Sequence, residues 1–250
     1  MKSPIFHSHP TVLPESRISD YSYHHFSKDF LVFKKIQINQ KRRKSCINQY
    51  CNLTPKFQYK KQLPEQKLQD RGKITLCLDL DHTLISTSRT QIENYDFSIS
   101  LPIDQKRTQK LYIKKRPLLD LFLQKCSEMF EIVLFTASVK SYADKVLDIL
   151  DPDNSLISHR LYRGSCSFYN GHYAKDLCLL NRDLHSILII DDAKFSFVFQ
   201  PENAIWINPF YNNLDTNQFV DNQLEDVLSI LENVYIQHNV IDTLASYRNK

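Results

Sequence analysis

The chain has 250 residues, of which 42% are hydrophobic, enough for one sizeable core but too few for two full domains. Its three glycines, Gly72, Gly164 and Gly171, cannot form a GxxxxGK loop or a GxGxxG fingerprint, which excludes those classes of nucleotide-binding enzyme. Residues 1–70 carry 13 Lys and Arg against 5 Asp and Glu, a net of +8, and the rest carry 19 against 23, a net of −4. The sequence therefore predicts one mildly acidic domain preceded by a basic extension.

The six cysteines are scattered without a CxxC pair, which is typical of a protein in a reducing compartment. No apolar run approaches the roughly 18 residues that a membrane-spanning helix needs, and the first 30 residues lack the apolar core of a secretory signal. We therefore expect a nuclear or cytoplasmic protein without a membrane span. Nothing in the sequence indicates its oligomeric state.

Residues 1–69 mix His, Pro, Tyr, Lys and Gln without sustained periodicity, so we expect a largely irregular extension. The KRRK run at 41–44 is compatible with a nuclear-import signal, a contact for an acidic partner or a solvated basic patch. His7, His9, His24 and His25 have no Cys or carboxylate at ligand spacing, so no zinc site is expected. Direct binding of nucleic acid is not expected either.

The first predicted strand is KITLCLDL, residues 73–80, a short apolar run that ends in acidic residues. It is followed by Phe97, Ile99, Leu101 and Ile103, which are spaced by two, then by the polar DQKRTQK and by LYIKK. This pattern predicts a β-hairpin inserted after the first strand.

Helical and strand patterns alternate in the remainder of the chain. Pro117 is expected to start a helix, and its apolar face is formed by Leu118, Leu121, Phe122 and Cys126. EIVLF (131–135) and SILIIDD (186–192) predict two more buried strands. Between them Ser138 can cap a helix that carries Tyr142, Val146, Ile149 and Leu150, and a last helix spans 224–234. The alternation predicts an α/β fold with a central parallel sheet flanked by helices.

Asp79 and Asp81 stand two apart at the end of the first strand, where residues two apart share a face. Two neighbouring carboxylates repel, and a divalent cation or a shared proton relieves the repulsion. One carboxylate can attack phosphorus while the other donates a proton to the leaving oxygen. A hard, oxygen-ligated Mg²⁺ would let one anion approach another.

The other strand ends add polar groups at the same edge of the sheet. Thr136 and nearby backbone N–H groups can hold phosphate oxygens, although Ser138 can equally be a helix cap. Asp191 and Asp192 form a second acidic pair, and a metal ion between the two pairs would offset their charge. Lys175 can balance a phosphoryl group, although such a lysine, like Arg163 in a loop, is often only a surface residue.

Seven motifs stand in the order found in the FCP/SCP-type serine phosphatases, which the chain resembles over about residues 73–236. They are LDLDHTL, KKRP (114–117), VLFTAS, HRLYRGSC, GHYAKDLCLLNRDL, LIIDD and PENAIWINPF. That family comprises the small phosphatases of the RNA polymerase II carboxy-terminal domain and their relatives, within the haloacid dehalogenase superfamily. The resemblance implies an α/β, HAD-like Rossmannoid core over residues 70–240, between the extension 1–69 and a C-terminal tail, 241–250.

The resemblance also implies roles for individual residues. Asp79 would be the phosphoryl acceptor and Asp81 the acid/base, with Thr83 packed behind them and Thr136 and Lys175 binding phosphate. Mg²⁺ would be held by the Asp79 carboxylate, the Asp81 backbone carbonyl and Asp192. The residues implied to contact the substrate are Arg163 and the hydrophobic pocket of Leu101, Ile103, Val139 and Tyr142.

The sequence departs from the small members of this family at two informative positions. Asp192 stands where they usually have Asn, and Arg89 stands near an aromatic residue of their pocket rim. The expected partner is a phosphorylated protein or peptide, such as the polymerase tail. Two alternatives stay open: a small-molecule phosphatase, which normally has a larger cap domain, and a non-catalytic binding module, in which the acidic motif has degenerated.

Overall fold

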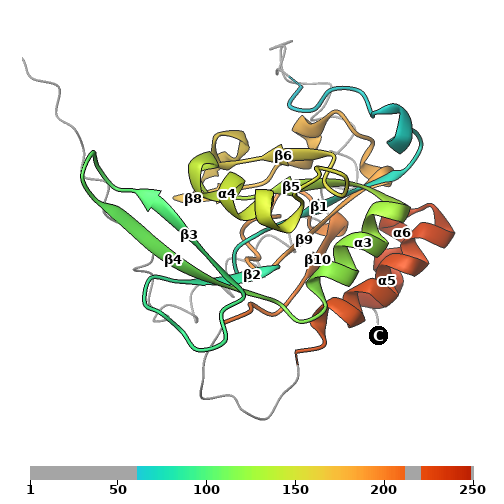
Figure 1. Ribbon diagram of the computed structural model, residues 1–250. Helices are drawn as coiled ribbons and strands as arrows, with labels where there is room; N and C mark the ends of the chain where they lie inside the picture. The colour runs from blue at the N-terminus through green and yellow to red at the C-terminus, as the bar shows by residue number, and fades with distance from the viewer. Residues whose placement is uncertain (1–60, 212–220, 249–250) are drawn as a thin grey trace, which may run out of the picture. The chain divides into compact units, whose positions relative to one another are not determined.

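The computed structural model describes residues 61–211 and 221–248, to which all structural statements refer (Figure 1). Most of the basic extension, including KRRK at 41–44 and the four histidines considered for zinc, lies outside the described residues. The same holds for residues 212–220 and 249–250.

A five-stranded parallel sheet forms the centre of the domain, in the order β10-β9-β1-β5-β6. Its strands are β1 (Ile74–Leu78), β5 (Phe130–Phe135), β6 (His159–Leu161), β9 (Ile187–Asp191) and β10 (Ala204–Trp206). In β1, Cys77 pairs with Val133 of β5 on one side and with Ile189 of β9 on the other. Because β1, β5 and β9 are neighbours in a parallel sheet, the polar groups that follow them meet at one edge. The α/β prediction is confirmed.

The two faces of the sheet are covered differently. Four α-helices pack on one face: α3 (Leu119–Met129), α4 (Lys140–Leu150), α5 (Gln223–Gln237) and α6 (Val240–Arg248). The other face is covered by Leu63, by loop residues and by the 3₁₀ helix η3 (Leu177–Leu180). Alternate residues of β1 divide accordingly, with Leu76 in the helical cluster and Cys77 in the opposite one. Burial on both faces explains why β1, β5 and β9 are mostly apolar.

Two small antiparallel sheets accompany the central one. The predicted hairpin is present as β3 (Phe97–Pro102) and β4 (Thr108–Lys115), and β2 (Ile85–Ser88) adds a third strand in the order β2-β4-β3. A second hairpin, which the sequence did not suggest, consists of β7 (Ser167–Tyr169) and β8 (His172–Ala174). Its turn needs positive φ angles, which Asn170 (49°) and Gly171 (84°) adopt. This hairpin leads directly into Lys175.

The expected start of the first helix is wrong. Helix α3 begins at Leu119 rather than at Pro117, because Leu118 takes a left-handed conformation with φ of 66°. The turn rotates the helix relative to the expected face, so that Leu118 and Leu121 are exposed. Phe122 and Cys126 are buried as expected.

Folded structure extends past both expected domain boundaries. At the start, Leu63 is buried and Gln66 hydrogen-bonds to Glu131 at the beginning of β5. At the end, residues 241–248, expected as a tail, lie in α6, where Leu244 is buried and Arg248 donates to three backbone carbonyl oxygens. No helix among the described residues has both the length and the apolar character needed to cross a bilayer.

Candidate active site

Strand β1 ends at Leu78, so Asp79 and Asp81 lie in the tight loop that follows it. Backbone hydrogen bonds from Leu84 and Ile85 to the Leu80 carbonyl close this loop. The expectation that the two carboxylates share one face of a strand is therefore wrong, and each has its own set of partners.

His82 lies in the turn of this loop with φ of 64°. Its ring centroid lies 4.6 Å from that of Tyr211, and Nδ1 lies 3.3 Å from the Phe210 carbonyl oxygen. These contacts hold the loop against the segment that follows β10.

Lys175 is the buried cation of the site. Its Nζ atom lies 2.5 Å from Asp79 Oδ1 and 2.6 Å from Asp191 Oδ2. Burial alone would lower the pKa of Lys175, but Asp191 and Asp79 outweigh it and raise that pKa above its usual value. The ammonium group therefore stays charged. Sequence reasoning assigned no contact to Asp191, although its place beside Asp192 at a strand end was a usable signal.

Asp79, Asp191 and Asp192 form an acidic cluster in which one oxygen from each lies within 4.8 Å of the others. Burial, followed by the charge of Asp79, raises the pKa of Asp192 to about 7, and burial also raises the pKa of Asp191. Three carboxylates share one ammonium group here, so the cluster is net negative when all three are ionised. An all-oxygen, negatively charged set of this kind fits a hard divalent cation such as Mg²⁺.

Thr83 lies behind this cluster, as expected, and is fully buried. Its hydroxyl donates to Asp192 Oδ1 at 3.3 Å and accepts the Asp192 N–H at 3.2 Å. These bonds join the loop after β1 to the end of β9 and so orient one of the expected metal ligands. The Asp81 carbonyl as a further ligand stays a prediction.

The carboxylate of Asp81 is held by two hydroxyl groups of the segment that follows β5. Ser138 Oγ donates to Oδ2 at 2.6 Å, and Tyr142 Oη donates to Oδ1 at 2.5 Å. Removal of the carboxyl group from water raises the pKa of Asp81, against the effect of these two bonds. The alternative that Ser138 caps α4 is wrong, because no side chain caps that helix and this hydroxyl binds Asp81 instead.

Thr136 and Arg163 are both anchored to the loop between β5 and α4. Thr136 is buried, and its hydroxyl accepts the Ser138 N–H at 3.0 Å. Arg163 Nε donates to the Ala137 carbonyl oxygen at 2.7 Å, and its guanidinium lies over the Tyr173 ring at 5.3 Å. Both residues thus adjoin the loop that holds Asp81. Their contacts with phosphate and substrate stay predictions.

The four residues expected to form an apolar pocket lie on β3, just beyond it, and around the start of α4. Tyr142 is buried and Leu101 is half-buried, whereas Ile103 and Val139 are 54% and 38% exposed. Lys145 of α4 donates to the Ser100 carbonyl of β3, so these two elements face each other. The placement is compatible with an open surface for substrate beside Asp81.

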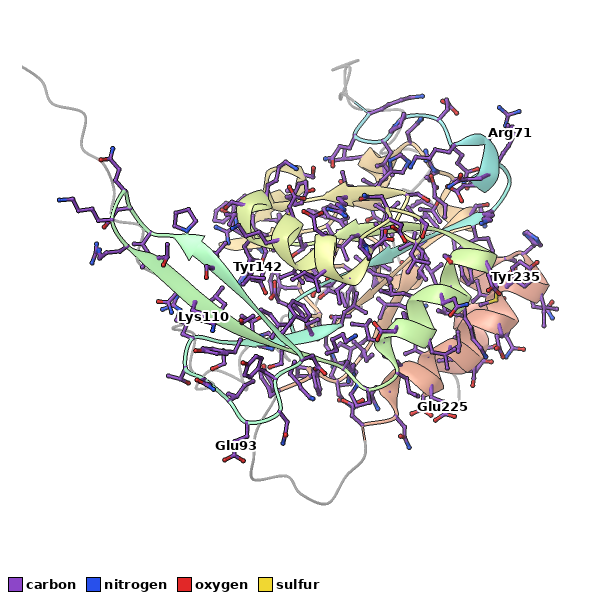
Figure 2. The ribbon with its side chains drawn as sticks, viewed as in Figure 1. Arg71, Glu93, Lys110, Tyr142, Glu225 and Tyr235 are labelled. Carbon is purple, nitrogen blue, oxygen red and sulfur yellow. The ribbon has the colours of Figure 1, made fainter. Side chains whose placement is uncertain are left out.

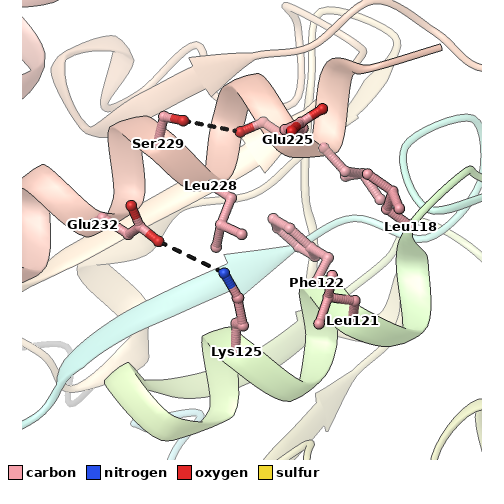
Figure 3. Close-up of a pocket in the computed structure, with 9 residues that line it drawn as sticks. Leu118, Leu121, Phe122, Lys125, Glu225, Leu228, Ser229 and Glu232 are labelled. Atoms are coloured by element: carbon pink, nitrogen blue, oxygen red, sulfur yellow. Dashed lines mark hydrogen bonds and ion pairs between the residues drawn. The ribbon is translucent and has the colours of Figure 1, made fainter. Parts of the chain in front are cut away.

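A separate groove lies between α3 and α5 (Figure 3). Its rim carries the ion pair between Lys125 and Glu232 at 4.0 Å, and exposed Leu118 and Leu121 contribute to its wall. It contains none of the residues that surround Asp79 and Asp81. This groove therefore contributes nothing to the chemistry of the site.

Arg116, within the KKRP motif, is a buried residue to which sequence reasoning assigned no role. Its guanidinium donates to the Thr83 carbonyl at 3.0 Å, to the Asn208 carbonyl at 2.8 Å and to Asp221 Oδ1 at 3.1 Å. It thus joins the loop after β1 to two segments that follow β10. A basic residue directly before a proline at an element boundary was the available signal.

Asp79 lies just after β1, the central strand of the parallel sheet, and buried Lys175 contacts it. The acidic pair of Asp191 and Asp192 lies at the end of β9, which pairs with β1. Together these features define an α/β fold of the haloacid dehalogenase type. The family model described as NLI interacting factor-like phosphatase matches residues 74–242. The chain belongs to this family and is a phosphoprotein phosphatase, which confirms the resemblance seen in its motifs.

Curated relatives agree with this assignment. The chain is 41% identical over 186 residues to human "Carboxy-terminal domain RNA polymerase II polypeptide A small phosphatase 1", covering 74% of this chain and 69% of the relative. It is 39% identical to human small phosphatase 2, covering 74% and 66%. With "Phosphatase PSR1" of Saccharomyces cerevisiae the identity is 40%, over 72% of this chain and 40% of the relative.

Among solved structures, the chain is similar to the fission yeast RNA polymerase II CTD phosphatase Fcp1 bound to beryllium fluoride. The TM-score is 0.48 at 25% identity, covering 71% of this chain and 54% of that one. A second structure of Fcp1 gives a TM-score of 0.49 at 26% identity. The family assignment rests on the sequence matches.

Proposed function

We propose that the protein is a Mg²⁺-dependent serine/threonine phosphatase that acts through an aspartyl-phosphate on Asp79. The observation that carries this proposal is the position of Lys175, whose buried ammonium contacts Asp79 directly. A lysine there pairs with the nucleophile and leaves positive charge where a phosphoryl group would arrive. Mg²⁺, held by Asp79, Asp192 and the Asp81 carbonyl, would supply the further positive charge that lets two anions approach.

The proposed reaction has two steps. An Asp79 oxygen attacks phosphorus, the phosphoserine P–O bond breaks, and Asp81 donates a proton to the departing serine oxygen. Water then attacks the aspartyl-phosphate while Asp81 takes its proton, which releases phosphate and restores the Asp79 carboxylate. Thr136 and Lys175 would hold the phosphoryl oxygens in both steps.

We further propose that the substrate is phosphoserine in an extended peptide, such as the carboxy-terminal domain of RNA polymerase II that the human relatives are named for. The described insertion is a three-stranded sheet, which leaves the site open to a polypeptide. Arg163, Leu101, Ile103, Val139 and Tyr142 would contact the residues that flank the phosphoserine. A nuclear or cytoplasmic location would suit such a substrate.

Hydrolysis of an aryl phosphate by the full chain tests the mechanism. Asp79→Asn should abolish both the Mg²⁺-dependent activity and the hydroxylamine-sensitive mass increase of a trapped phosphoenzyme. Asp153→Asn, at an exposed position outside the site, should keep both. Equal activity of Asp79→Asn and the parent chain would contradict the mechanism.

A panel of phosphopeptides, including serine-proline repeats, and small phosphate esters tests the substrate class. A higher kcat/KM for peptides would support the proposal, and no such preference would favour a small-molecule phosphatase. Binding of phosphopeptides without turnover in Mg²⁺ would indicate a non-catalytic binding module.

A further inference from the structure

The hydroxyl group of Tyr142 contacts two residues at once. It lies 2.5 Å from Asp81 Oδ1 and 2.7 Å from Thr87 Oγ1 of β2. Tyr142 is on α4, where the helix faces the three-stranded sheet (Figure 2). One atom therefore links the inserted sheet to the residue proposed as acid/base.

The direction of these bonds follows from proton counting. After Asp81 has given up its proton, its carboxylate only accepts, so the single Tyr142 proton is donated to Asp81. The phenolic oxygen is then free to accept, and Thr87 donates to it. The result is a chain that runs from Thr87 to Tyr142 to Asp81, while Ser138 binds the other Asp81 oxygen.

The ring and the hydroxyl of Tyr142 have separable roles. The ring packs in the hydrophobic cluster with Ala143 and Val146 of the same helix, and this packing requires no hydroxyl group. A phenylalanine would fill the same space. The hydroxyl, in contrast, forms bonds that reach outside α4 and restrict how the Asp81 carboxylate can rotate.

We propose that Tyr142 is a positioning residue, whose hydroxyl, itself held by Thr87, fixes the Asp81 carboxylate in the orientation required for proton transfer to the leaving oxygen. This inference rests on the proposed function, since it requires Asp81 to be the acid/base. It gives the inserted sheet a second role besides contacting substrate. Thr87 pairs with Ile113 of β4, which also pairs with β3, so a shift of that sheet would be transmitted to Asp81.

The test compares Tyr142→Phe with the parent chain on two kinds of substrate, which differ in whether the leaving group needs a proton. The nitrophenolate of p-nitrophenyl phosphate leaves readily without one, whereas phenyl phosphate and phosphoserine peptides depend on the general acid. General acid catalysis contributes about 10²–10⁴-fold, so we expect kcat/KM on the proton-requiring substrates to fall about 10-fold further than on p-nitrophenyl phosphate. Thr87→Val should shift the ratio in the same direction, by less.

Two controls separate positioning from loss of structure. Tyr235→Phe makes the same chemical change at an exposed position on α5 and should leave kcat/KM unchanged on both kinds of substrate. Adding Tyr142→Phe to Asp81→Asn should cause no further selective loss, because Tyr142 acts through Asp81. Thermal unfolding of each variant checks that it is folded, and Thr87→Val keeps the test valid if Tyr142→Phe does not fold.

The positioning role would be overturned if kcat/KM of Tyr142→Phe fell equally on both kinds of substrate or did not change. Additive losses of kcat/KM in the double variant would also overturn it. Failure of the proposed function looks different, because Asp79→Asn or Asp81→Asn would then retain activity on every substrate.

Discussion

The Nζ atom of Lys175 lies 2.5 Å from Oδ1 of Asp79, although 96 positions separate the two residues in the chain. Breaking a buried ion pair on one side leaves an uncompensated charge, at a cost of about 3–5 kcal/mol. Lys175→Gln should therefore lose activity and also unfold at lower urea concentration in metal-free buffer. Lys110→Gln, at an exposed position, should change neither property. A fully active, equally stable Lys175→Gln would contradict the assigned contact.

The acidic cluster predicts that activity depends on Mg²⁺ and that Asp192 strengthens Mg²⁺ binding. Asp192→Asn removes one negative charge but keeps an oxygen ligand, so the Mg²⁺ concentration for half-maximal activity should rise about 10-fold. The rate at saturating Mg²⁺ should be largely retained. A Mg²⁺ titration of hydrolysis measures both, with Asp153→Asn as the matched control. An unchanged Mg²⁺ requirement would argue against Asp192 as a ligand.

Chelation should act on stability as well as on rate. A cation that binds only the folded chain stabilises it by mass action, so Mg²⁺ should raise the unfolding temperature in proportion to the logarithm of its concentration. Asp79→Asn and Asp192→Asn should weaken that rise. Differential scanning calorimetry with and without EDTA makes the comparison, and a rise of the same size in both variants would contradict the proposed ligands.

A pH-dependent contribution to stability should come from Glu131, whose carboxylate is fully buried and forms two hydrogen bonds with Arg182 at 2.6 and 2.8 Å. Burial would raise the pKa of Glu131, but the bonds from Arg182, Thr75 and Gln66, with the His159 ring 3.5 Å away, outweigh it and hold that pKa well below its usual range. A depressed pKa stabilises the fold above the unfolded value of about 4.3 and loses this contribution as pH falls.

Glu131→Gln should therefore cost about 3 kcal/mol at pH 7, because it leaves Arg182 without its carboxylate. The deficit relative to the parent chain should shrink steadily below pH 4. Urea unfolding at several pH values measures this deficit in the free energy of unfolding. Glu128→Gln, at the exposed end of α3 and outside this network, is the control, and a deficit independent of pH would contradict the assignment.

Arg116 should matter for stability more than its charge suggests. Arg116→Lys keeps a cation but cannot reproduce three directed bonds, so it should cost about 2 kcal/mol in the free energy of unfolding. Arg107→Lys, whose side chain is 71% exposed, should change stability by less than about 0.5 kcal/mol. Denaturant unfolding of both variants provides the comparison.

The central strands β1, β5 and β9 were predictable from sequence because they are short apolar runs that end in polar residues, and this signal is local. The edge strands β6 and β10 were not predicted, because each has only three residues. The same reasoning extended β1 through Asp81, since an alternation of Leu and Asp does not show where a strand stops. The start of α3 was missed because Pro117 fits a first helical position, whereas the left-handed Leu118 has no local signal.

The contacts within the site were harder to predict from the sequence. Family resemblance suggested that Lys175 and Asp79 act together, but no periodicity pairs residues 96 positions apart. Ser138 was read as a possible cap because a hydroxyl before a helix usually is one, and Thr87 was not singled out. Their roles depend on where Asp81 turns after β1, which only the folded structure shows.

The central position of β1 also bears on how the protein is made. Asp79 is among the first residues of the domain to leave the ribosome, yet both its lysine partner and the neighbouring β9 are encoded about 100 codons later. Until that stretch has been translated, Asp79 lacks its lysine partner and one flank of β1 is unpaired. We therefore expect a nascent chain that stops before Asp191 to be inert, with phosphatase activity gained only when synthesis of the domain is nearly finished.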